Sequence, residues 1–185
     1  MRTRLTTRDL VLAALFAALT AVSAWIWAPV FGVVPFTLQV LFVLMAGLVL
    51  GARLGALSML VYLTLGLFAP VYAGGTSGLG VLFGPTGGYL WGFVLAAALT
   101  GALATRFGRT NPLVLSGCAL AGLVPIYALG AVWLAWQVDI SLWVAVKTGV
   151  LPFIPFDAVK ACVAGFTAYA LARSPLGLPS LVREG

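Results

Sequence analysis

Six apolar runs, each close to the length that crosses a lipid bilayer, constrain this chain more than any other feature. They cover residues 10–28, 36–50, 54–69, 88–105, 113–136 and 155–172. A helix that crosses the hydrocarbon core needs about 20 apolar residues, with a range of roughly 17–25. Only 8% of the residues are charged, whereas soluble domains carry about 25%. The sequence therefore predicts an all-α integral membrane protein with six transmembrane helices, as a single domain over residues 1–185.

The basic residues indicate how these runs are oriented. If successive connections alternate between the two sides of the membrane, one side receives Lys147 and the other receives eight arginines, namely Arg2, Arg4, Arg8, Arg53, Arg106, Arg109, Arg173 and Arg183. Cytoplasmic loops carry the excess of Lys and Arg, so both termini are expected in the cytoplasm. The connections 29–35, 70–87 and 137–154 are then outside. Because the basic residues are scattered singly, the net charge of +6 indicates topology and no nucleic-acid partner.

The N-terminal run also has features of a secretory signal peptide. Arg2 and Arg4 precede it, and small residues at 21–24 resemble a cleavage site. The apolar run continues through residues 25–27, however, and cleavage would leave five helices and spoil the segregation of charge. We therefore expect this run to be a transmembrane helix.

Asp157 and Lys160 are the most informative polar residues, because they lie inside the last apolar run. Residues three apart lie on the same face of a helix, so the two side chains can pair. One interpretation is structural: Pro155 suits the first turn of a helix, and an acid there interacts favourably with the helix dipole. The other is functional, because ionisable residues within membrane segments usually face a partner or a ligand. In that case Asp157 accepts hydrogen bonds from ligand N–H groups and Lys160 donates to a carbonyl or carboxylate.

The connection 70–87 is rich in glycine, so it cannot form one regular helix. Irregular backbone at membrane depth occurs where it is buried in protein or lines a cavity. The alternative is an outer loop without a specific role. Because this connection and the start of the last helix both lie on the outer side, we expect them in the same leaflet.

Alanines at a spacing of four mark one face of the first helix, namely Ala13, Ala17 and Ala21, with Ala14 and Ala18 beside them. Small residues let membrane helices approach closely. The face therefore either packs inside the bundle or docks a partner protein.

Several classes of chemistry are disfavoured. The chain has no histidine and two cysteines, Cys118 and Cys162, both in apolar runs. A structural zinc site needs four N or S ligands, so we expect no metal site and no cofactor. No phosphate-cradling motif is present, and we expect no catalytic residues.

Three stretches, 34–39, 73–93 and 152–161, together resemble the biotin-specific S-component family (BioY) of energy-coupling-factor (ECF) vitamin importers. They read VPFTLQ, AGGTSGLGVLFGPTGGYLWGF and PFIPFDAVKA, and the resemblance extends over nearly the whole chain. Two positions depart from the family pattern: Phe156 and Ser77 stand where the family usually has glycine.

The resemblance implies a biotin-binding subunit of a bacterial or archaeal cell membrane, with its site facing outward. It implies biotin contacts at Asp157 and Lys160, with secondary candidates at Gly75, Ser77, Thr86, Gly87 and Tyr89. It also implies two partners, a transmembrane coupling protein that docks on the alanine face of Ala13, Ala17 and Ala21, and ABC-type ATPase subunits that use the ATP. Another vitamin as ligand, an intramembrane lipid-modifying enzyme and a purely structural subunit remain as alternatives.

Overall fold

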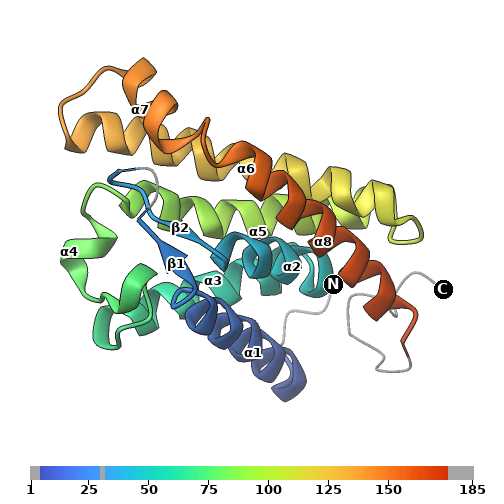
Figure 1. The fold of residues 1–185 in the computed structure, drawn as a ribbon. Coiled ribbons are helices and arrows are strands. Elements are labelled where there is room, and N and C mark those ends of the chain that lie inside the picture. The colour runs from blue at the N-terminus through green and yellow to red at the C-terminus, as the bar shows by residue number, and fades with distance from the viewer. Residues whose placement is uncertain (1–4, 30–31, 175–185) are drawn as a thin grey trace.

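The computed structural model describes residues 5–29 and 32–174, so Arg2, Arg4 and Arg183 of the predicted charge pattern lie outside it. Six long helices form the body of the molecule (Figure 1). They are α1 (Thr7–Ser23), α2 (Gln39–Leu50), α3 (Ala52–Phe68), α5 (Gly87–Phe107), α6 (Pro112–Gln137) and α8 (Ile154–Ala172). Each lies within one of the predicted apolar runs or overlaps it closely. By length and composition, three of the helices in the described part of the chain, α5, α6 and α8, can cross a membrane, and α2 and α3 are shorter apolar helices.

The short helix α2 lies at the centre of the bundle. It packs against α5, α8, α3 and α1, and ten of its twelve residues are buried. A helix that is apolar all round is expected to be buried, because it has no polar face to present to water. Gly51, with φ of 83°, ends α2 and allows the chain to turn directly into α3. The predicted break at 51–53 is therefore confirmed.

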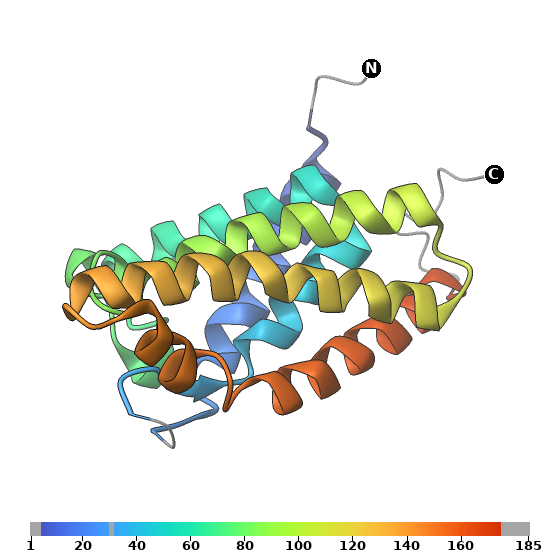
Figure 2. The ribbon, with the colours of Figure 1, turned by 90° about the horizontal axis from the view of Figure 1, so that it is seen from above.

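Small elements gather at one end of the bundle (Figures 1 and 2). They are the antiparallel strands β1 (Trp27–Ala28) and β2 (Phe36–Thr37), the 3-10 turn η1 (Ala73–Gly75), and the short helices α4 (Leu79–Leu82) and α7 (Leu142–Gly149). We call this the hairpin end. The turns α2–α3 and α5–α6, the start of α1 and the end of α8 lie at the opposite end.

The hairpin end corrects one predicted boundary. The first helix ends at Ser23 and not at Ala28, because the backbone of Trp27 and Ala28 pairs with β2 and cannot continue the helical ladder. The connection 137–154, for which no helix was predicted, contains α7. The glycine-rich connection 70–87 is, as predicted, not one regular helix.

The described basic residues are segregated between the two ends. Lys147 lies on α7 at the hairpin end. The described arginines lie in or beside the opposite ends of the helices, at Arg8, Arg53, Arg106, Arg109 and Arg173. This distribution is the one that the sequence predicts for a chain that crosses a membrane in alternating directions.

The alanine face of α1 packs inside the bundle. Ala13, Ala17 and Ala21 are 1%, 0% and 8% exposed, on the side of α1 that contacts α2 and α3. Their small side chains let the helices approach closely. They form no exposed surface in this structure, and a docking role for these three residues stays a prediction. Ala14 and Ala18, which lie beside them about 100° around the helix, are exposed.

Candidate functional site

Asp157 and Lys160 lie in the first turns of α8, where the helix begins at the hairpin end. Both side chains are buried, with exposed fractions of 3% for Asp157 and 7% for Lys160. The Nζ atom of Lys160 lies 2.7 Å from Oδ1 of Asp157. The predicted i, i+3 pair is therefore present. Its burial requires further hydrogen bonds, because desolvated charges are costly unless their remaining donors and acceptors are satisfied.

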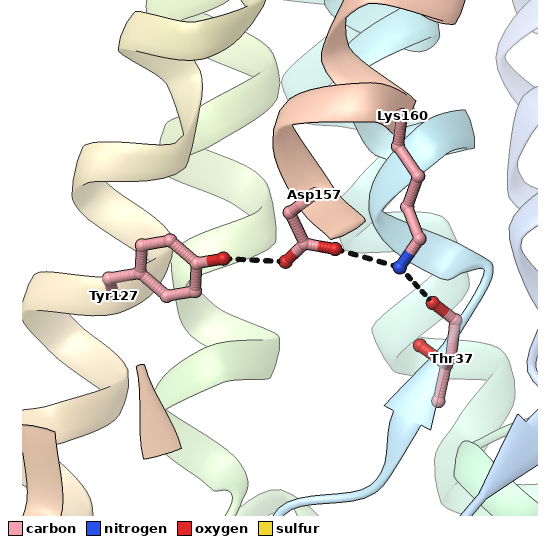
Figure 3. Close-up of polar contacts among 4 residues, drawn as sticks. All are labelled: Thr37, Tyr127, Asp157 and Lys160. Atoms are coloured by element: carbon pink, nitrogen blue, oxygen red, sulfur yellow. Dashed lines mark hydrogen bonds and ion pairs between the residues drawn. The ribbon is translucent and has the colours of Figure 1, made fainter. Parts of the chain in front are cut away.

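Two further elements supply these hydrogen bonds (Figure 3). The hydroxyl of Tyr127, on α6, donates to Oδ2 of Asp157 at 2.7 Å. The ammonium of Lys160 donates to the backbone carbonyl of Thr37, on β2, at 2.6 Å. Both carboxylate oxygens and two of the three ammonium N–H groups are thus engaged. The network connects α8 to α6 and to the hairpin.

The network lies on the wall of a cavity at the hairpin end. The cavity is bounded by β2, the start of α2, the connection 70–87, α5, α6, α7 and α8. Its polar groups include Thr37, Gln39, Thr86, Tyr89, Tyr127, Asp157 and Lys160. Its apolar wall includes Val34, Val40, Phe93, Ile126 and Phe153. A concave, largely apolar site with a few convergent polar groups is typical of small-molecule binding.

Two of the secondary candidates lie on this cavity. Thr86 precedes α5, and Tyr89 lies in its first turn. The hydroxyl of Tyr89 donates to the carbonyl of Gly149 at 2.9 Å, which ties α5 to the end of α7. Tyr89 therefore shapes the wall and holds α7 in place.

The other three candidates do not reach the cavity wall. Ser77 is exposed. A Cβ atom at Gly87 would lie 2.2 Å from the carbonyl oxygen of Leu82, so this glycine serves close backbone packing. Gly75, with φ of 75°, adopts a left-handed turn beside the ring of Trp25. None of the three lies on the cavity wall in this structure, so their part in the site stays a prediction.

Several polar cavity residues were not predicted from the sequence. Tyr127 could have been found, because a phenol in the middle of an apolar span needs a hydrogen-bond partner. The carbonyl of Thr37 carries no sequence signal. Gln39 lies in the first resembling motif, and its amide donates to the hydroxyl of Tyr62, which in turn donates to the carbonyl of Val71 at 3.2 Å.

The glycine-rich connection is fastened to the bundle at several points. The indole of Trp133, on α6, donates to the carbonyl of Gly84 at 2.9 Å. The amide of Gly78 donates to the carbonyl of Gly66, at the end of α3, at 2.7 Å. These bonds give the connection a defined path beside the cavity, which a loop without a specific role does not require.

Tyr72 anchors the start of the same connection. It lines the cavity, and its hydroxyl donates to the carbonyl of Leu63 at 2.7 Å. Burial raises the pKa of this phenol, so it remains a protonated donor. Its ring lies against Gly66, where a Cβ atom would be 2.1 Å away. Only glycine at position 66 leaves room for this ring.

Comparison with known proteins gives consistent matches over almost the full chain. The sequence profile of the BioY family matches residues 1–175. The "Biotin transporter BioY" of Thermotoga maritima is 43% identical over 90% of this chain and 96% of its own length. The "Probable biotin transporter BioY" of Pyrococcus horikoshii is 46% identical over 89% of this chain and 96% of its own length. A crystal structure of the S-component for biotin from an ECF-type ABC transporter superposes with a TM-score of 0.85 at 28% identity, over 92% of this chain and 96% of that one.

Proposed function

The chain belongs to the BioY family, and we propose that it is the biotin-binding S component of an ECF-type vitamin importer. The protein is a membrane protein with a mostly helical fold that matches a known biotin S-component. In this proposal it has no catalytic residues of its own. It binds biotin in the cavity at the hairpin end and delivers it inward with partner subunits.

The observation that carries the proposal is the buried Asp157–Lys160 pair on the cavity wall. The ureido ring of biotin offers two N–H donors and one carbonyl acceptor. Asp157 accepts only, and Lys160 donates only, so the pair matches both kinds of group. Charge-assisted hydrogen bonds of this type are about twice as strong as neutral ones.

Charge also favours one orientation of biotin. The carboxylate of biotin is negative, and a like charge beside Asp157 would be unfavourable in a desolvated site. We therefore propose that the ureido ring meets the ion pair. The valerate chain then runs along the apolar wall of the cavity, which Thr86 and Tyr89 also line.

We propose six membrane crossings with both termini in the cytoplasm. The concentration of the described arginines at one end supports this orientation through the positive-inside rule. The hairpin end, and with it the cavity, then faces outside. The relatives come from a bacterium and an archaeon, in which the membrane is the cell membrane.

The partners in this proposal are a transmembrane coupling protein and ABC-type ATPase subunits. A coupling protein would need an exposed surface, which Ala13, Ala17 and Ala21 do not offer. Ala14 and Ala18 are exposed on the outer side of α1, so that side remains available.

The test is biotin binding by the purified protein. We expect mass spectrometry to detect biotin released from it, and titration to give saturable binding. Asp157→Asn and Lys160→Met should each weaken binding more than tenfold, because each removes a charge-assisted hydrogen bond worth about 1.5–3 kcal/mol. Matched controls are Asp139→Asn and Lys147→Met, which alter an exposed acid and an exposed lysine. Release of another vitamin, or equal affinity in all four variants, would contradict the proposal.

A further inference from the structure

The ammonium of Lys160 has a third neighbour besides Asp157 and Thr37. The ring of Phe36, on β2, lies with its centroid 4.0 Å from Nζ. A cation within about 6 Å of an aromatic centroid is attracted by the ring quadrupole, most strongly where water is excluded. Since Lys160 is only 7% exposed, this contact is of the desolvated kind.

Phe36 is itself held by a second ring. Its centroid lies 5.4 Å from that of Phe156, at an interplanar angle of 72°. Edge-to-face pairs of this geometry are favourable beyond the area that they bury. Phe156 directly precedes Asp157 on α8, so the two rings join the hairpin to the helix that carries the ion pair.

The two rings lie outside the cavity wall. Thr37, Asp157 and Lys160 line the cavity, whereas Phe36 and Phe156 do not. Phe156 is 48% exposed on the outside of the molecule. The ring of Phe36 therefore contacts the ammonium of Lys160 without itself lining the cavity.

We propose that Phe36 and Phe156 are positioning residues for biotin recognition. Phe36 fixes the ammonium of Lys160 at the cavity wall by the cation–π contact, and Phe156 fixes the ring of Phe36. The proposal rests on the function proposed above, in which Lys160 donates to the ureido carbonyl. It also gives Phe156, the departure from the glycine of the resembling family, a defined role.

The experiment compares biotin affinity in substitutions that keep or remove the aromatic face. Phe36→Leu keeps an apolar side chain and removes the ring, and should raise the biotin Kd roughly 2- to 30-fold. Phe36→Tyr retains the ring and should restore most of the affinity. Phe156→Leu acts indirectly and should give a smaller increase. Phe166→Leu is the control, because Phe166 is equally exposed on α8 at 51% and lies away from the pair.

Two further measurements separate positioning from a general structural effect. In the Lys160→Met background, Phe36→Leu should leave the Kd unchanged, because the ring then has no cation to hold. Desthiobiotin, which keeps the ureido ring and lacks the sulfur, should lose affinity for Phe36→Leu by the same factor as biotin. If Lys160→Met binds too weakly to be measured, the desthiobiotin comparison and the rescue by tyrosine decide.

Distinct results would overturn this inference and the proposed function. A wild-type protein that does not bind biotin contradicts the proposed function. Biotin binding that is unaffected by Phe36→Leu, or equally weakened by Phe36→Leu and Phe36→Tyr, contradicts the positioning role alone. A loss for biotin without a loss for desthiobiotin would mean that Phe36 acts on the thiophane ring and not through Lys160.

Discussion

Replacing Lys160 by methionine tests the buried ion pair most sharply. Methionine retains a long apolar stem and removes the charge, so the carboxylate of Asp157 stays 3% exposed without its counter-ion. The Tyr127 hydroxyl, 2.7 Å from Oδ2, is a neutral donor and cannot compensate fully. Removing one partner of a buried pair costs about 3–5 kcal/mol. At about 2–4 °C per kcal/mol for a chain of this size, the melting temperature should fall by roughly 6–20 °C.

The double variant Asp157→Asn/Lys160→Met provides the decisive comparison. It removes both charges and leaves an amide that still accepts from Tyr127, so it should be more stable than Lys160→Met. Replacing a buried pair by neutral groups is often neutral or stabilising. Thermal unfolding of the ligand-free protein in detergent, followed by tryptophan fluorescence, gives the order of stabilities. Lys147→Met, on the exposed side of α7, should change stability by no more than about 0.5 kcal/mol.

Biotin titration of the same proteins separates stability from recognition. Both the single and the double variant should lose affinity, although the double variant recovers stability. A Lys160→Met protein as stable as wild type would show that Asp157 is not held as a buried, paired carboxylate. A double variant less stable than the single one would refute the reasoning from desolvation.

Three smaller perturbations test the surroundings of the pair. Tyr127→Phe removes the hydroxyl donor to Asp157 and should weaken biotin binding about tenfold, since hydrogen bonds to charged groups contribute roughly 1.5–3 kcal/mol. Unchanged affinity would mean that this bond does not orient the carboxylate. Gly88→Ala would place a Cβ atom 2.3 Å from Cβ of Trp133 and should destabilise the ligand-free protein by about 1–3 kcal/mol, as measured by thermal unfolding. Trp133→Phe removes the indole donor to Gly84 and should increase hydrogen exchange in the 70–87 connection, while unaltered exchange would show that the bond does not hold the loop.

The positions of the helices could be predicted from the sequence because they depend on local properties. The length of an apolar run decides whether a helix can cross the hydrocarbon. Gly51, with its positive φ, separates two such runs. The grouping of the described arginines at one end of the bundle could also be predicted, because successive runs alternate in direction. The two-residue strands and α7 could not be predicted, because the backbone pairing of Trp27 with Thr37 is decided by which segments the bundle brings together.

The sequence could not predict which helix faces are buried, for a further reason. In a soluble protein a polar face marks the outside, but lipid and protein interior are both apolar. Ala13 and Ala14 are therefore equivalent in the sequence, although the first is buried and the second exposed. The sequence therefore could not decide which set of alanines on α1 is buried.

The sequence by itself determined the pair of Asp157 and Lys160, because residues three apart on a helix must share a face. Only the tertiary structure decided what surrounds it. Tyr127 lies 30 positions away along the chain and Thr37 lies 123 positions from Lys160, and no local pattern connects such residues. Burial of the pair removes water as a hydrogen-bond partner, so the fold must supply each remaining donor and acceptor from neighbouring elements. That requirement is met by α6 and β2, which pack against the pair at the cavity wall.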